Sequence, residues 1–501
     1  MLGYGCLMVL FVVMVQVADW YGSEFAAAAI ILVVVAALAL VRPATALGLV
    51  ILLALVGDGV AMAWWPVVKN FSSFESVLYL SDGLSVNPFE IVLLTVLLTW
   101  LISRSTSPTR EPIRWGFFWV PIVIFTASLV FGFAWGLSRG GDFRVAIFEA
   151  RPLFYVALVY LAALNLFTTM AHYRRLLWGI CIVLTIEAVH ALIRLSDIRM
   201  VIAEDGSPVE HTAALHMNLV MLLFIATMWF GSTRIGKRPA LFLMVVPVLI
   251  LYLDAERRAA VVGLIVGGLF LSITLFTRNR QKFRRIIPIM VVIGAAYCGA
   301  FWNSQSQAGF PAQAVKIIVQ PDSSSEKDAS SDLYREIENF DLNATIRSAP
   351  ITGIGFGVPF LQPIPLPDIS FFEFAEYIPH NSVLWMWTKV GAVGFLSFLY
   401  LFSSGIALGI RSSARVVDPD DAATVATFSA FIPMTLVVAF VDITFDAQTM
   451  ILLSVALALV ASAERLCGLP VPEERSAGPV RDRSAVEQPT THDVIPVGRP
   501  A

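Results

Sequence analysis

Residues 379–410 read PHNSVLWMWTKVGAVGFLSFLYLFSSGIALGI, and this stretch shows how the chain is organised. From residue 382 onward it is a long apolar run, which predicts a helix that spans a membrane. Directly before that run, His380 and Asn381 follow the one sizeable polar segment, 303–380, that interrupts an otherwise apolar sequence. The imidazole of His380 is therefore expected at the start of a spanning helix, where membrane meets water.

The composition of the whole chain points to a membrane protein. Hydrophobic residues make up 57% and charged residues 14%, and the mean hydropathy is +0.78. A soluble protein of 501 residues would be less apolar and more highly charged. The apolar runs do not alternate with polar residues, as the strands of a membrane barrel would. A net charge of -3 indicates no affinity for nucleic acid, and four isolated cysteines predict no disulfide framework.

Fourteen apolar runs are expected to form spanning helices, so the predicted fold class is an all-α polytopic bundle. The runs are 7–17, 25–41, 45–65, 88–103, 116–136, 152–167, 176–193, 217–231, 241–253, 259–277, 286–302, 382–410, 423–441 and 448–463. We expect four regions: spans 1 to 11 within 1–302, an external insert at 303–381, spans 12 to 14 within 382–463, and a tail at 464–501. The tail has little to bury, so it is expected to be disordered.

The distribution of Lys and Arg predicts the orientation. Five basic loops fall on one side under this span count, and short basic loops lie in the cytoplasm; their residues lie within 104–114, 174–175, 234–238, 278–285 and 411–415. Both termini are then expected in the cytoplasm and the insert outside, as in a multi-pass protein of the bacterial inner membrane.

Inside the insert, one amphipathic helix is predicted. Asp332 is the expected N-cap and Pro350 the expected end, and one apolar stripe lies at helical spacing: Leu333, Ile337, Phe340 and Ala344. Such a helix would lie on the membrane surface or pack on the bundle. The following TGIGFG at 352–357 is interpreted as a flexible turn, because no strand precedes it and no P-loop lysine follows.

The insert is acidic, with ten Asp and Glu residues against four Lys and Arg residues in 303–380. It is therefore not a nonspecific anion trap, and any phosphate binding must use individual arginines. Arg151 and Arg258 each begin an apolar span, where a guanidinium lies at headgroup depth and suits a lipid-linked diphosphate. The simpler alternative is that neighbouring acids, such as Glu149 and Glu256, neutralise these arginines.

His380 is the candidate general base. A lone histidine is usually a satisfied polar residue, but Pro379 fixes the approach of His380 and Asn381 can orient it. Its position near several external arginines and the ordinary titration range of histidine suit proton transfer. His211 and His216 are five residues apart, which is not a helical metal pair, and no catalytic metal is predicted.

The order of several motifs resembles the bacterial O-antigen ligase and O-antigen polymerase superfamily. ERRAA at 256–260 opens a span, PITGIGFG at 350–357 lies in the insert, and His380-Asn381 and Gly391 follow. EARPL at 149–153 is also similar to the family. The specific likeness covers roughly residues 251–410, and the additional spans and long tail depart from typical ligases.

This resemblance implies a membrane-embedded, GT-C-like glycosyltransferase that needs no metal or cofactor. Such an enzyme would transfer or polymerise a glycan from an undecaprenyl-diphosphate donor onto an acceptor hydroxyl at the outer face of the inner membrane. His380 would activate the acceptor, with Asn381 beside it, and Arg258 would hold the diphosphate. Weaker candidates for the same charge stabilisation are Arg257, Arg151, Arg335 and Arg347. Expected partners are the lipid-linked donor, a glycan or lipid acceptor, membrane lipids and other polysaccharide-assembly proteins.

Two other classes of function remain open. A transporter or flippase of lipid-linked glycans would have as many spans, but it should carry ionisable residues near the membrane midplane and repeat symmetry. Here the charges crowd the ends of the spans. A structural or regulatory membrane protein would use the insert to bind a partner, although no large soluble domain is present.

Overall fold

The computed structural model describes residues 23–56, 67–74, 76–107, 112–195, 209–210, 212–231, 237–304, 306–320, 326–367 and 374–469. Every regular element in these ranges is a helix. Eleven of the helices are long and apolar enough to cross a membrane, which confirms the prediction of a polytopic helical bundle. They are α2 (Glu24–Val41), α4 (Pro88–Thr106), α5 (Trp119–Ser138), α6 (Phe143–Leu166), α7 (Met170–Ile193), α9 (Ala213–Phe230), α11 (Arg258–Arg278), α12 (Arg280–Phe301), α15 (Ser382–Arg415), α16 (Pro419–Val438) and α17 (Ala447–Leu466).

The other three predicted spans account for the difference from fourteen. The run at 7–17 lies outside the described residues. The described part of the run at 45–65 lies in the shorter helix α3 (Pro43–Leu55), with 13 residues, and 57–65 lie outside the described residues. The run at 241–253 forms α10 (Lys237–Asp254), an 18-residue helix with three charged residues at its ends. The predicted tail also lies outside the described residues from 470 onward, and α17 continues to Leu466.

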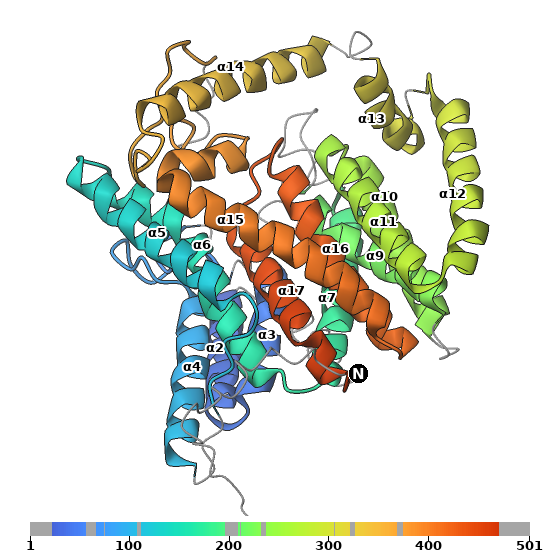
Figure 1. Cartoon of the computed structure of the whole chain (residues 1–501). Helices are drawn as coiled ribbons and strands as arrows, with labels where there is room; N and C mark the ends of the chain where they lie inside the picture. Colours follow the sequence, from blue (N-terminus) through green and yellow to red (C-terminus); the bar gives the residue numbers. More distant parts are fainter. Residues whose placement is uncertain are drawn as a thin grey trace, which may run out of the picture.

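The centre of the bundle is made by the last three helices. α15 crosses it, with α5 and α6 on one side and α9, α10 and α11 on the other (Figure 1). α17 packs along α6, and α16 packs against α9, α11 and α15. Small residues permit this close approach: a Cβ on Gly409 of α15 would lie 2.8 Å from the Cβ of Ser429 on α16. α12 lies at the outer edge and has no buried residue.

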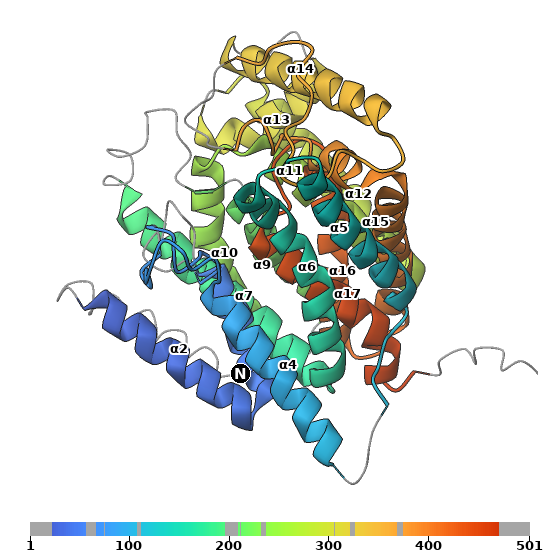
Figure 2. The same cartoon turned by 90° about the vertical axis from the view of Figure 1, so that its left-hand side faces the viewer.

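The helix ends that border the predicted basic loops lie at the end of the bundle opposite α14 (Glu326–Ser348), which lies over the other end in two perpendicular views (Figures 1 and 2). α11 begins at Arg258, beside α14, and ends at Arg278, whose guanidinium bonds to the carbonyl oxygens that follow α15. Arg174, near the start of α7, pairs with Asp421, near the start of α16. The sequence-based grouping of basic loops therefore corresponds to one end of the molecule.

The insert helix differs from its prediction. α14 begins at Glu326, so Asp332 lies within the helix and is not its N-cap, whereas the end at Ser348, before Pro350, is as expected. Leu333 and Phe340 of the predicted apolar stripe are more than half exposed. The buried side chains include Glu338 and Asp341, because both carboxylates accept hydrogen bonds from backbone amides of the following loop. The insert also contains η1 (Gln307–Gly309) and α13 (Phe310–Val319), which were not predicted.

The glycine-rich segment 353–357 is not a flexible turn, because it is buried between α5 and α15. The Ile354 amide donates to the Thr388 carbonyl at 2.7 Å, and the Phe356 amide donates to the Gly132 carbonyl at 3.1 Å. Gly355 has φ +87°, and a Cβ there would lie 2.3 Å from the Gly136 nitrogen. The segment needs glycine because backbones from three parts of the chain meet here.

The same loop meets a break in α15. Gly391 interrupts the helix with φ +67°, which a residue with a side chain rarely adopts. The Ala392 amide donates to the Pro350 carbonyl at 3.1 Å, and a Cβ on Gly391 would lie 2.0 Å from the Ile351 oxygen. The break therefore makes room for the chain that leaves α14, and it joins the insert to the centre of the bundle.

Candidate functional site

His380 is held by a carboxylate of the insert helix. Glu338 Oε2 accepts the His380 backbone amide at 2.9 Å, and Glu338 Oε1 lies 3.3 Å from His380 Nδ1. Glu338 is almost fully buried, whereas the His380 side chain keeps 22% of its surface exposed. When the imidazole is neutral, this contact favours a proton on Nδ1, and Nε2 then carries the lone pair. A neutral imidazole held in this way can accept a proton at Nε2.

Asn381 has a different role from the one expected. Its Oδ1 accepts the Leu384 amide at 3.0 Å, so it is the N-cap of α15, and its Nδ2 donates to Asn339 Oδ1 at 2.8 Å. Glu338, and not Asn381, contacts the imidazole of His380. Since Glu338 and Asn339 are consecutive on α14, the insert helix fixes both residues at the start of α15.

Tyr334 adds an aromatic wall to the histidine. Its ring meets the His380 ring edge-on, with centroids 5.6 Å apart. Burial, together with the charge of Glu338, raises the pKa of Tyr334 to about 12. The phenol therefore stays protonated at neutral pH and is available as a hydrogen-bond donor.

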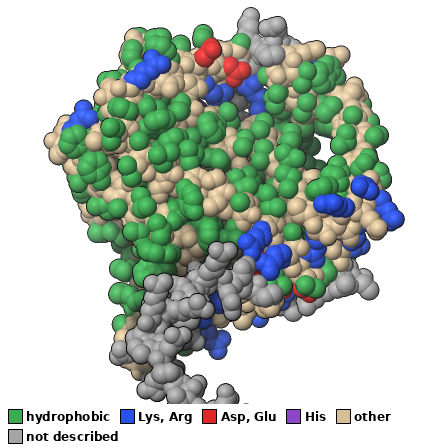
Figure 3. Space-filling model, viewed as in Figure 1, with side chains coloured by type: hydrophobic (Ala, Val, Ile, Leu, Met, Phe, Trp, Pro, Cys, Tyr) green, Lys and Arg blue, Asp and Glu red, His purple; other side chains and the backbone are tan. Residues whose placement is uncertain are grey.

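Two of the predicted arginines, Arg258 of α11 and Arg335 of α14, contact the same carboxylate of α14. Arg258 Nη2 lies 3.7 Å from Asp332 Oδ1, and Arg335 Nη1 lies 3.3 Å from the same oxygen. Arg335 is one helical turn from Glu338, so the arginine pair and the histidine follow the same side of α14. Figure 3 shows Lys and Arg side chains in a recess beneath α14, with acidic side chains next to them. Asp332 Oδ1 therefore lies within reach of both guanidinium groups.

Arg257 lies at the same turn but points elsewhere. Its Nη2 donates to the Val209 carbonyl at 3.3 Å. Glu256, just before it, has φ +50°, the sole positive φ of a residue other than glycine in the ranges the structure describes. Strained backbone of this kind costs about 1–3 kcal/mol and is frequent at functional sites. The turn between α10 and α11 thus separates the directions of the two arginines.

Arg151 and Arg347 are not brought to His380 by any contact among the described side chains. Arg151 on α6 pairs with Glu90 at 3.2 Å and also bonds to Asn70 and to the Ser85 carbonyl. This network fastens the segment before α4 to α6, so three groups already occupy the guanidinium. Arg347 is exposed on the last turn of α14.

A buried ion pair not foreseen from the sequence lies beneath the glycine-rich segment. Lys389 Nζ is 2.7 Å from Glu149 Oε1, and both side chains are fully buried. Glu149 Oε2 accepts the Gly357 amide at 2.6 Å, and Lys389 donates to the Val358 carbonyl at 2.6 Å. Glu149 therefore pairs with Lys389 on another helix, although the sequence suggested a role in neutralising nearby arginines. The signal was present, because Lys389 is the one charged residue in 382–410.

The fold and this cluster define a class of protein, namely a helical protein with the features of a multi-pass membrane protein. Where its insert helix meets the starts of α11 and α15, it carries a histidine, two carboxylates and two arginines. No protein-family model matches the chain, and no curated protein sequence matches it. The chemistry of the cluster is therefore the basis for a proposal about function.

Proposed function

We propose that this protein is a glycosyltransferase of the O-antigen ligase and polymerase type. It takes a glycan from an undecaprenyl-diphosphate donor and transfers it to an acceptor hydroxyl at the outer face of the bacterial inner membrane. The observation that carries the proposal is the contact of Glu338 with His380. Glu338 belongs to α14, the helix whose Asp332 and Arg335 also lie beside Arg258. A base and a cationic anion site are the two parts that such a transfer requires.

The proposed reaction is a substitution at the anomeric carbon of the donor sugar. The acceptor oxygen forms the new bond to that carbon, and the bond from the carbon to the phosphate oxygen breaks. His380 Nε2 takes the proton of the hydroxyl, and Glu338 stabilises the imidazolium that results. Undecaprenyl diphosphate leaves with the bonding electrons, so atoms and charges balance without a further reactant.

The arginines act on the leaving group. Arg258 and Arg335 would bind the diphosphate, because guanidinium forms paired, charge-assisted hydrogen bonds with phosphate oxygens. Asp332 holds both arginines. We expect the diphosphate to replace Asp332 as their partner when the donor binds. Arg257 contributes to the positive potential of the same turn, and no direct contact is required of Arg151 or Arg347.

The alternative, a transporter or flippase, is supported by one observation. Lys389 and Glu149 are ionisable residues inside the bundle, where transporters often carry such groups. Their charges are paired, and each also bonds to the backbone of the buried 357–358 segment. This engagement favours a structural role, so the transferase proposal is preferred.

The test uses purified full-length protein with a synthetic undecaprenyl-diphosphate glycan and candidate acceptors. Release of lipid diphosphate and product length are followed for wild type, His380→Ala and His172→Ala. His172 is a matched control. The glycine-rich segment meets the chain at the start of α6, whereas His172 follows the other end of α6, at the start of α7. We expect His380→Ala to lower transfer by about 10²- to 10⁴-fold while the protein remains in the membrane.

The products decide between the subclasses. A ladder of lengthening glycans indicates a polymerase, and a single transfer to one acceptor indicates a ligase. Full activity in His380→Ala would contradict the proposal. If no lipid diphosphate is released and the glycolipid moves across the vesicle membrane, the protein is a transporter and the transferase proposal fails.

A further inference from the structure

A cavity of about 310 Å³ lies at the end of the bundle opposite α14. Three segments form its walls: the last residues of α9, the turn between α11 and α12, and residues 414–417 at the end of α15. It is separated from Arg258 by the length of α11, whose 21 residues rise by about 30 Å. The cavity is therefore distinct from the cluster around His380.

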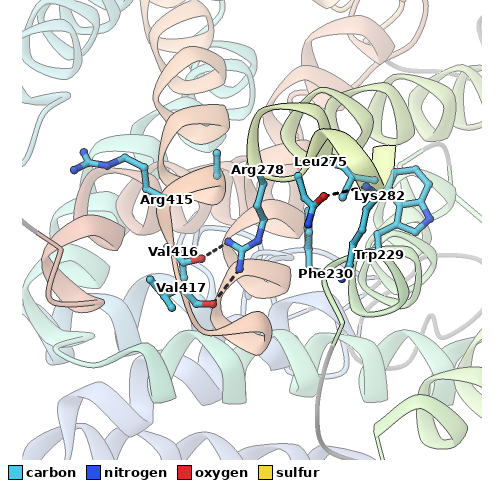
Figure 4. Close-up of a pocket in the computed structure, with 10 residues that line it drawn as sticks. Trp229, Phe230, Leu275, Arg278, Lys282, Arg415, Val416 and Val417 are labelled. Atoms are coloured by element: carbon cyan, nitrogen blue, oxygen red, sulfur yellow. Dashed lines mark hydrogen bonds between the residues drawn. The ribbon is translucent and has the colours of Figure 1, made fainter. Parts of the chain in front are cut away.

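The wall of the cavity is cationic. It includes Arg278, Lys282 and Arg415, and no Asp or Glu occurs among its described lining residues. Arg278 donates to backbone carbonyls of Val416 and Val417, which orient the guanidinium without neutralising it (Figure 4). Arg415 points away from Arg278 and pairs with Glu464 at 2.7 Å. The acid that acts on Arg278 is Asp418, which is engaged as the N-cap of α16.

The start of α12 contributes further positive potential. Asn279 lines the cavity and is the N-cap of this helix, accepting the Lys282 amide at 2.9 Å. The N-terminal end of a helix carries a partial positive charge and amides that lack partners within the helix. This feature adds to the charges of Arg278 on α11 and Lys282 on α12.

Aromatic residues line the other side. Trp229 and Phe230 belong to the wall, and the guanidinium carbon of Arg278 lies 5.8 Å from the centre of the Phe230 ring. Tryptophan at the end of a spanning helix is typical of the membrane–water interface. A ligand with an anionic group and an adjoining apolar part would therefore find cationic side chains for the first and an aromatic wall for the second.

We propose that this cavity binds the phosphate group of an anionic ligand. Basic pockets between helix ends at the membrane surface recognise the headgroups of anionic lipids. A soluble phosphate compound would offer the same group to Arg278 and Lys282. The site is independent of the donor site proposed near His380, and it has no part in the transfer step.

The experiment titrates full-length protein in detergent with phosphatidylglycerol and counts bound lipid by native mass spectrometry. Lys282→Gln is the test variant, because its amide and not its side chain makes the helix-capping bond. Arg284→Gln is the matched control, since a position two residues further on lies on another face of α12. We expect about fivefold weaker binding at the tightest site for Lys282→Gln and wild-type binding for Arg284→Gln. Arg278→Gln is a second test variant, used together with a melting curve.

A further arm adds inorganic phosphate to the lipid-bound protein. Displacement of the lipid in wild type, and not in Lys282→Gln, supports the phosphate site and identifies soluble phosphates as ligands. Retention of the lipid in wild type, with weaker binding in Lys282→Gln, supports the site and identifies the lipid headgroup as its ligand. Equal lipid binding in wild type, Lys282→Gln and folded Arg278→Gln, with no effect of phosphate, would overturn the proposal.

Discussion

Glu338 contacts His380 twice, through the backbone amide at 2.9 Å and through Nδ1 at 3.3 Å. The first contact fixes the position of the residue, and the second fixes the orientation of its ring. Because Glu338 belongs to α14 and His380 directly precedes α15, the position of the candidate base depends on how the insert packs on the bundle.

Replacing Glu338 by Gln should separate orientation from binding. The amide keeps the shape of the side chain but removes the charge that stabilises an imidazolium, so we expect kcat for glycan transfer to fall by at least about tenfold. KM for the donor should change little, since Glu338 contacts His380 whereas Asp332 contacts the two arginines. Steady-state kinetics of wild type and Glu338→Gln measure both quantities, and a rise in KM without loss of kcat would assign Glu338 to substrate binding instead.

Changes at Arg258 and Asp332 should have opposite effects on the donor. Arg258→Gln removes a charge-assisted contact, and we expect donor affinity to fall by about 10- to 100-fold. Asp332→Asn removes the carboxylate that both arginines share, so the donor should bind a few-fold more tightly. Arg347→Gln, on the same helix as Asp332, is the matched control. Binding of a non-reactive lipid diphosphate reports all three, and equal losses for Arg258→Gln and Arg347→Gln would refute the assignment.

The buried pair Glu149 and Lys389 should behave as a unit. Lys389→Met leaves a buried carboxylate without its cation, which is expected to lower the free energy of unfolding by about 3–5 kcal/mol. Glu149→Gln combined with Lys389→Met should cost less than the sum of the two single changes. Equilibrium denaturation of all four proteins completes the cycle, and strict additivity would mean that the two residues do not interact.

Gly355 should tolerate no side chain. Its φ of +87° and the approach of the Gly136 backbone predict that Gly355→Ala costs about 2 kcal/mol or more. A Cβ added to Gly294 on α12 would have no other atom within 4 Å, so Gly294→Ala should leave the melting temperature unchanged or slightly raised. If both variants melt together with wild type, the close contact of the 353–357 segment is wrong.

Asp341 should make stability depend on pH. Burial raises its pKa above the usual 3.8, aided by Glu338 and opposed by the hydrogen bond from the Ile364 amide. The folded state thus holds the proton more tightly than the unfolded state, so this contribution is full below pH 3.8 and is lost as pH rises through the folded-state pKa. Asp341→Asn should therefore be more stable than wild type at neutral pH, with a gap that closes in acid. Melting curves across pH test this, and a gap that widens in acid would reverse the sign.

Local properties of the sequence predicted the helices well. Every predicted span except 7–17, which lies outside the described residues, overlaps a helix, because length and hydropathy are properties of one stretch of chain. The predicted buried face of α14 was wrong, because burial of a helix face depends on partners elsewhere in the chain. Leu333 and Phe340 follow helical periodicity, but Glu338 and Asp341 are buried since their partners come from later residues.

The sequence by itself determined that the chain is a helical bundle and that His380 and Arg258 are candidates, since their positions relative to apolar runs are visible in one dimension. Arg335 was only one of the weaker candidates that the family resemblance implied. Only the tertiary structure decided that Arg335 and Glu338 on α14 reach Arg258 and His380, and that Glu149 pairs with Lys389. Hydropathy carries no information about which helices become neighbours. The buried glycine-rich segment joins the insert to α5 and α15, and these contacts link parts that are distant in the chain.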